Sequence, residues 1–298
     1  MALKSIVVGR AGRVRSGWKV AGFLSLSVVA VAVAAVLIGM FAPAGALRDG
    51  QPWPVVTLSA LLVLGVCALF LRLERRGWAD AGLLPDVPRL RQFLAGLAGG
   101  VALIGGLAWA LMLAGVLHWE PNRPFTTALM LSGTAYFAGA VLLEELMFRG
   151  YALRRLAEGI GAPAAVALLA VVFGGYHLVS IGSSPAVKSG GADLVWMAAG
   201  PLIGALVFGV AAIRTGSIAL PLGLHLGWNW TQWHFFTFPG DDNPVGLWAP
   251  VVSAHWIASP APFRIGYVVT MAVALTAILA LTRRPRARQP FLLAPGLS

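Results

Sequence analysis

The chain has 298 residues, of which 58% are hydrophobic and only 11% are charged, and its mean hydropathy is +0.82. A soluble domain of this size could not cover so much apolar surface with so few charges, and the apolar runs are too continuous for a membrane β-barrel. The formal net charge is +11, but the basic residues flank the apolar runs, so they indicate membrane topology and not nucleic-acid binding.

Taken in chain order, the apolar runs predict an all-α, polytopic membrane helix bundle with about eight transmembrane helices. They cover about 20–41, 55–71, 93–117, 126–148, 163–181, 195–213, 217–237 and 265–282. The connector 72–92 is predicted as a short interfacial piece or a plain loop, and 238–264 as a loop on the outer interface. Residues 20–41 are predicted as an uncleaved anchor, although Ala44-Gly45-Ala46 resembles a signal-peptide cleavage site.

Basic residues mark alternate connectors, which predicts how the chain crosses the membrane. The richer connectors hold Lys4, Arg10, Arg13, Arg15 and Lys19, then Arg72, Arg75, Arg76, Arg89 and Arg91, then Arg149, Arg154 and Arg155, then Arg214, and finally Arg283, Arg284, Arg286 and Arg288. The others hold only Arg48, Arg123, Lys188 and Arg264. This asymmetry predicts a multi-pass protein of the cell membrane with both termini in the cytoplasm.

The same division predicts five parts of one membrane-embedded chain. They are a basic cytoplasmic N-terminus (1–19), the first three transmembrane helices (20–125), a core (126–237), the outer loop with the last transmembrane helix (238–282) and a basic cytoplasmic tail (283–298). Inside the core lie polar side chains that are costly in hydrocarbon and are therefore candidates for function. These are Glu144, Glu145, His177, His225, Asn229, Gln232 and His234.

Helical spacing separates the roles of these polar side chains. Glu145 and Arg149 are four residues apart and can pair on one helix face, whereas Glu144 points about 100° away. His225 and Asn229 also share a face, and His234, about half a turn away from His225, is expected at the outer interface.

A predicted turn brings two of the candidates together. Gly159-Ile160-Gly161 with Pro163 two positions later predicts a hairpin between two helices, and antiparallel arms then place Glu144 opposite His177. A carboxylate and an imidazole that meet in a low-dielectric site suit general-base chemistry. Either histidine alone is better explained as a structural hydrogen-bonding group, and Asn229 as a contact between helices, whereas the set on three helices indicates a site.

Three motifs carry a resemblance to a known family. Glu144-Glu145-Leu-Met-Phe-Arg149-Gly150 resembles an EExxxR motif, Phe173-Gly-Gly-Tyr-His177 an FxxxH motif and His225-Leu-Gly-Trp-Asn229 an HxxxN motif. In this order they resemble the CPBP (CAAX prenyl endopeptidase and bacteriocin-processing, or Abi) family of intramembrane proteases, over about residues 128–235. The resemblance implies that 126–237 is the catalytic core.

The resemblance also implies a role for each motif residue. Glu144 and His177 would activate the attacking water, His225 and Asn229 would stabilise the oxyanion, and the supporting residues would be Glu145, Arg149 and Phe173. The predicted function is an intramembrane endopeptidase with its cavity near, and open to, the cytoplasmic side. Its partners would be membrane lipids and a peptide or membrane-protein substrate, with no nucleic acid. An ion- or proton-coupled transporter and an inactive scaffold of the same fold are the alternatives.

No cofactor is expected, although zinc remains the alternative. Glu144, His177 and His225 could bind zinc with one position open for water. No HExxH motif is present, and the single cysteine, Cys67, excludes a cysteine zinc site within the chain.

Overall fold

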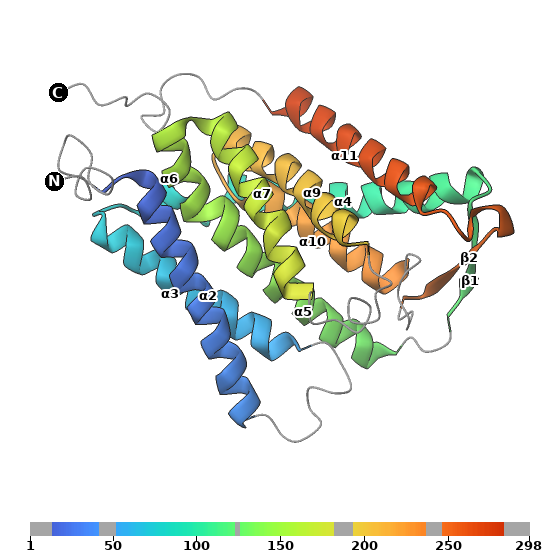
Figure 1. Ribbon diagram of the computed structural model, residues 1–298, viewed down its shortest axis with the longest axis horizontal. Coiled ribbons are helices and arrows are strands. Elements are labelled where there is room, and N and C mark those ends of the chain that lie inside the picture. Colours follow the sequence, from blue (N-terminus) through green and yellow to red (C-terminus); the bar gives the residue numbers. More distant parts are fainter. Residues whose placement is uncertain (1–13, 42–51, 123–125, 182–192, 237–245, 283–298) are drawn as a thin grey trace.

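The computed structural model describes residues 14–41, 52–122, 126–181, 193–236 and 246–282 (Figure 1). The Ala44-Gly45-Ala46 sequence and the basic tail 283–298 lie outside the described residues. The helices, in chain order, are α2 (Ser16–Phe41), α3 (Trp53–Leu73), η1 (Trp78–Ala81), α4 (Val87–Leu113), α5 (Thr127–Glu145), η2 (Leu146–Gly150), α6 (Tyr151–Ile160), α7 (Ala162–Ile181), α9 (Leu194–Thr215), α10 (Ala219–Phe235), η3 (Ala254–Trp256) and α11 (Ala261–Leu281).

The predicted all-α membrane fold is confirmed. Within the described ranges, seven helical stretches are long and apolar enough to span a membrane. The seventh predicted segment, 217–237, is also a helix, α10, but with 17 residues it is shorter than each of those stretches. Two boundaries differ from the prediction: α4 begins at Val87, inside the expected connector, and the fourth segment continues to Ile160 as one helix with α5, η2 and α6.

A small sheet was not predicted. Strand β1 (Leu117–Pro121) pairs antiparallel with β2 (Trp248–Val252), in a register that places Leu117 opposite Val252. Part of the expected outer loop 238–264 is therefore a strand and a short 3-10 helix. The pairing was not foreseen because short strands of Trp, Pro and Val, far apart in the chain, carry no alternating pattern that distinguishes them from a loop.

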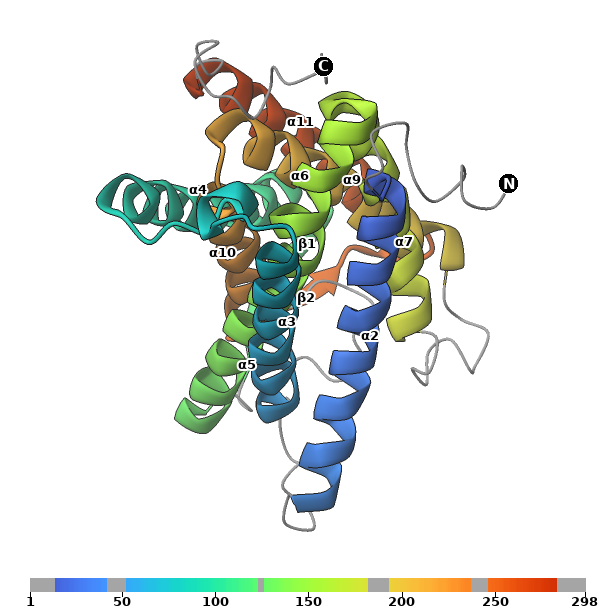
Figure 2. The same ribbon diagram turned by 90° about the vertical axis from the view of Figure 1, so that its left-hand side faces the viewer.

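The bundle has two different ends, which Figure 1 shows at the left and at the right. We call the end with the α6–α7 turn the basic end; α3, α9 and α11 finish there, and α4 and α10 begin there. We call the end that carries β1 and β2 the sheet end; α4 and α10 finish there, and α9 and α11 begin there. Viewed from the left of Figure 1, α2 and α3 lie in front of the remaining helices (Figure 2).

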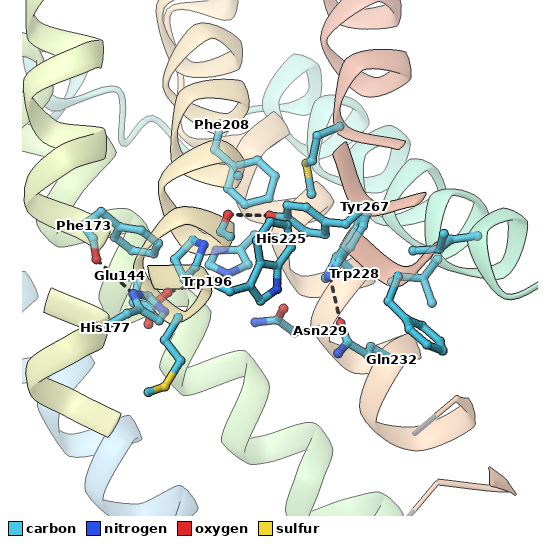
Figure 3. Close-up of a pocket in the computed structure, with 18 residues that line it drawn as sticks. Glu144, Phe173, His177, Trp196, Phe208, His225, Trp228, Asn229, Gln232 and Tyr267 are labelled. Carbon is cyan, nitrogen blue, oxygen red and sulfur yellow. Dashed lines mark hydrogen bonds and ion pairs between the residues drawn. The ribbon is translucent and has the colours of Figure 1, made fainter. Parts of the chain in front are cut away.

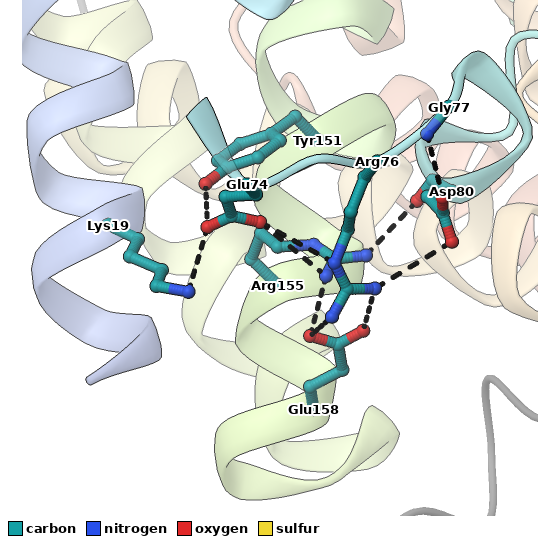
Figure 4. A network of polar contacts seen from close by, with 8 residues as sticks. All are labelled: Lys19, Glu74, Arg76, Gly77, Asp80, Tyr151, Arg155 and Glu158. Atoms are coloured by element: carbon teal, nitrogen blue, oxygen red, sulfur yellow. Dashed lines mark hydrogen bonds and ion pairs between the residues drawn. The ribbon is translucent and has the colours of Figure 1, made fainter. Parts of the chain in front are cut away.

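A network of ion pairs and hydrogen bonds links the charged side chains at the basic end (Figure 4). Glu74, at the end of α3, bonds to Lys19 of α2 at 2.9 Å and accepts a hydrogen bond of 2.9 Å from the Tyr151 hydroxyl. Arg155 bonds to Glu158 at 2.7 Å and is only 1% exposed. Arg154 is 6% exposed, so two of the arginines that were counted as connector charges are buried parts of the bundle.

Glycines set how closely α4 and α10 approach. A Cβ atom added at Gly100 of α4 would lie 2.3 Å from the Leu224 carbonyl oxygen, and one at Gly223 of α10 would lie 2.1 Å from the Phe93 carbonyl oxygen. Gly96 and Gly227 repeat this pattern one turn away. Small residues at four-residue spacing let helix backbones touch, so α4 holds the helix that carries His225 and Asn229.

The hairpin between α6 and α7 turns at Gly161, as the sequence predicts. Gly161 has a φ of +83°, a conformation that suits glycine and stops α6. Helix α7 begins at the next residue, Ala162. The tight turn makes the arms antiparallel and brings α7 alongside the long helix that contains Glu144.

Candidate active site

Four predicted site residues from three helices line one cavity of about 450 Å³ (Figure 3). Glu144 comes from α5, His177 from α7, and His225 and Asn229 from α10. The cavity therefore collects the polar residues that three membrane helices would otherwise expose to hydrocarbon.

Glu145 does not line the cavity but forms a hydrogen bond with His225 on the side of the imidazole that faces away from the cavity. Its Oε1 atom lies 3.0 Å from Nδ1 of His225 and 3.1 Å from Nη1 of Arg149. The side chain of Glu145 is fully buried and that of Arg149 is 2% exposed. A carboxylate accepts hydrogen bonds, so Nδ1 of His225 carries a hydrogen and donates a hydrogen bond to Oε1 of Glu145. The Glu145–Arg149 ion pair thus also orients a predicted catalytic residue.

Aromatic rings enclose the guanidinium of Arg149. Its carbon Cζ lies 4.4 Å from the ring centre of Phe173 and 5.6 Å from that of Phe208. Cation–π attraction is strongest in such desolvated places, which explains why phenylalanines surround this charge. Phe208 also stacks on His225, with ring centres 4.9 Å apart and an angle of 27° between the planes. Phe173, predicted as a supporting residue, therefore packs between Arg149 and His177, whose ring centre is 4.5 Å away.

Glu144 meets His225 on the cavity side. Oε2 of Glu144 lies 3.6 Å from Nε2 of His225, so this imidazole is flanked by two carboxylates. Nδ1 of His177 bonds at 3.0 Å to the carbonyl oxygen of Phe173, and a carbonyl only accepts. In the neutral ring of His177 the basic nitrogen is therefore Nε2.

More helices line the cavity than the sequence predicted. Besides the expected fourth, fifth and seventh segments, α4, α9 and α11 contribute side chains that no motif singled out. These are Ile104, Leu107, Trp196, Met197, Phe208, Phe263, Tyr267 and Met271. Apolar and aromatic residues at helical spacing look like ordinary packing in a sequence, so only Pro201, inside α9 beside Gly200, carried a signal of irregularity there.

Two further polar residues of α10 take structural positions. Gln232 lines the cavity and accepts a hydrogen bond of 3.0 Å from Trp228. His234, expected at the outer interface, is instead fully buried, and its ring nitrogens bond to the carbonyl oxygens of Trp230 at 2.7 Å and Met130 at 3.1 Å. Close packing of α5 on α10 at Gly133 explains its burial, because Gly133 leaves room for the His234 ring.

The zinc alternative does not fit the geometry. In the described part of the chain, no three His, Cys, Asp or Glu side chains are arranged to hold a metal ion. Of the three residues considered as ligands, His225 directs one nitrogen to Glu145 and the other to Glu144 itself. That activity does not depend on a metal stays a prediction to test.

A family model matches part of the chain. Residues 124–231 match the family model described as Rce1-like, type II CAAX prenyl endopeptidase. The matched stretch begins just before α5 and includes all three motifs, so the family resemblance is confirmed there. No curated protein and no solved structure matched the chain.

Proposed function

We propose that this chain, whose residues 124–231 match the CAAX prenyl endopeptidase family, is an intramembrane endopeptidase that uses a glutamate and a histidine to activate water. The family implies a protease, and the long apolar helices imply that it works within a membrane. The observation that carries the proposal is the convergence of Glu144, His177, His225 and Asn229 on one cavity from three helices.

In the proposed reaction, a water in the cavity attacks the carbonyl carbon of the scissile peptide bond. Glu144 takes a proton from this water, and Nε2 of His177 is the second basic group at the same site. The carbonyl oxygen becomes an oxyanion, for which the Asn229 amide and a protonated Nε2 of His225 are the donors. The proton held by Glu144 then passes to the peptide nitrogen, the C–N bond breaks, and the carboxylate is restored.

Glu145 and Arg149 act as positioning residues in this proposal. The oxyanion role requires a second proton on His225, because Nδ1–H is already directed at Glu145. The carboxylates of Glu145 and Glu144 flank the imidazole of His225 at 3.0 Å and 3.6 Å. Arg149 holds Glu145 in place through the 3.1 Å contact.

The proposal is tested by the peptide termini that the protein creates. Membranes that contain the wild-type chain are compared with membranes that contain Glu144→Ala, with chemical labelling and mass spectrometry of new amino termini. New termini that depend on Glu144 are expected, and Glu158→Gln, a carboxylate at the basic end far from the cavity, is expected to leave them unchanged. The same set of termini with and without Glu144 would overturn the assignment.

A further inference from the structure

A second groove, with a volume of about 790 Å³, runs along the outside of the bundle between α4 and α11. Among the described residues, none lines both this groove and the cavity that holds Glu144. On α4 the groove extends from Arg91 to Leu103, which is about 18 Å at 1.5 Å per residue. Half of a hydrocarbon core of about 30 Å is about 15 Å thick, so the groove is about as long as one leaflet is deep.

Small side chains keep this groove open. Ala95, Gly99 and Ala102 line it from one face of α4, at spacings of four and three residues. Ala274 and Ala277 line it from α11, and leucines of α10 line it as well. Such a wall offers hydrocarbon contact and no polar side chain, so it suits an acyl chain.

One end of the groove is positively charged. Arg91 lies in the second turn of α4 and Arg214 in the last turn of α9, and both line the groove where these helices reach the basic end. The nearby Arg89 is paired with Asp86 at 2.8 Å, whereas neither groove arginine has an ion pair within the described residues. The sequence after α11 supplies four more arginines and no Asp or Glu. An anion from outside the chain is therefore the complementary group for this end.

Two polar side chains at the charged end have unused hydrogen-bonding capacity. Arg214 is held by α11, because its Nε donates to Oγ1 of Thr282 at 3.1 Å and its Nη2 to the Leu279 carbonyl oxygen at 3.0 Å. Its Nη1 makes no hydrogen bond within the ranges that the structure describes. Gln92 also lines the groove, and its amide oxygen is buried without a hydrogen-bond partner in the same part of the chain. A buried polar atom without a partner is costly, so a donor from a bound molecule would satisfy it.

We propose that this groove binds an anionic phospholipid. Its phosphate lies against Arg91 and Arg214, a headgroup hydroxyl donates to Gln92, and one acyl chain follows the small residues of α4 and α11. Basic pockets between membrane helices are typical sites for anionic headgroups. Such lipids are concentrated in the cytoplasmic leaflet, which is the side predicted for this end from its basic connectors. The site is independent of the proposed proteolysis.

Lipid titration of the purified full-length protein, followed by native mass spectrometry, tests the proposal. The probes are dioleoyl phosphatidylglycerol, phosphatidylcholine with the same acyl chains, and inorganic phosphate. Each arginine near a headgroup contributes about a fivefold gain, so one phosphatidylglycerol should bind about 25-fold more tightly than phosphatidylcholine. Inorganic phosphate should not displace it, because phosphate has no acyl chain to fill the groove.

Two variants separate the headgroup from the chain. Arg91→Gln should weaken phosphatidylglycerol binding about fivefold and leave phosphatidylcholine unchanged, and Arg72→Gln, an exposed arginine of α3 outside the groove, is its control. Ala277→Phe should fill the groove and weaken binding of both lipids. Its control is Ala272→Phe, an exposed position about 140° around α11. Circular dichroism checks that each variant is folded.

Equal affinity for the two lipids would overturn the proposal, because it would indicate an ordinary lipid-facing surface. Displacement by inorganic phosphate would show a site for the headgroup alone and would also overturn it. Equal losses in Arg72→Gln and Arg91→Gln would indicate general surface attraction. Normal binding in Ala277→Phe would place the lipid outside the groove, and either of these last two results would refute the assignment.

Discussion

Replacing Glu145 by glutamine should destabilise the protein strongly, because it leaves a buried arginine without its counter-charge. Glu145 is fully buried, Arg149 is 2% exposed, and their atoms lie 3.1 Å apart. At an effective dielectric constant of about 20, this distance corresponds to about 5 kcal/mol of attraction. Breaking one partner of a buried pair costs about 3–5 kcal/mol, and we expect a loss of unfolding free energy in this range.

The loss can be measured by unfolding the purified protein in mixed micelles with increasing SDS, followed by circular dichroism. The double variant Glu145→Leu/Arg149→Met removes both charges and is the matched control. It should recover the unfolding free energy to within about 2 kcal/mol of the wild type, since neither charge is then left unpaired. A single variant within about 1 kcal/mol of the wild type, or a double variant no more stable than the single one, would refute the reasoning.

Three further predictions concern the site, its metal dependence and its scaffold. Glu144→Gln and His177→Ala should each lower proteolysis at least a hundredfold in a peptide-cleavage assay while circular dichroism shows a folded protein; near-normal turnover in either would remove the general-base role. Purified active protein should keep its activity after extensive chelation, and one zinc per chain that is lost and restored together with activity would contradict this. Gly100→Ala should destabilise α4 against α10 by about 1–3 kcal/mol in the same SDS titration, whereas Gly105→Ala, with nothing within 4 Å, should be neutral or stabilising; equal effects would contradict the packing argument.

The sequence was sufficient for the helices and for the polar floor of the site. Apolar runs long enough to cross a membrane leave few alternatives to helices, and a turn at Gly161 fixes which residues of two antiparallel arms lie level. Glu144 and His177 therefore line one cavity, as the hairpin argument predicted. Their catalytic roles stay predictions, because geometry alone does not show turnover.

The remaining features depend on tertiary packing, which no local pattern records. Arg154 and Arg155 look like connector charges in the sequence, yet carboxylates of α3, η1 and α6 make them internal. Trp196 and Phe263 look like lipid-facing residues, yet α9 and α11 place them in the wall of the cavity. Such residues come together only when distant helices pack, so the apolar wall of the cavity could not be predicted from motif spacing.

The π turn Leu146–Gly150 has a consequence for how the chain can change in evolution. A π turn holds one residue more than a regular α-helical path, and it sits between the part of the helix with Glu144 and Glu145 and the part with Arg154 and Arg155. Deleting one residue there would remove the extra residue and restore a regular helix with the two parts in nearly the same relative orientation. Deleting one residue from a regular turn on either side would instead rotate the two parts by about 100°, so that the carboxylates would leave the cavity or the arginines would leave their partners. The π turn should therefore tolerate the loss of a single residue better than the regular turns that flank it.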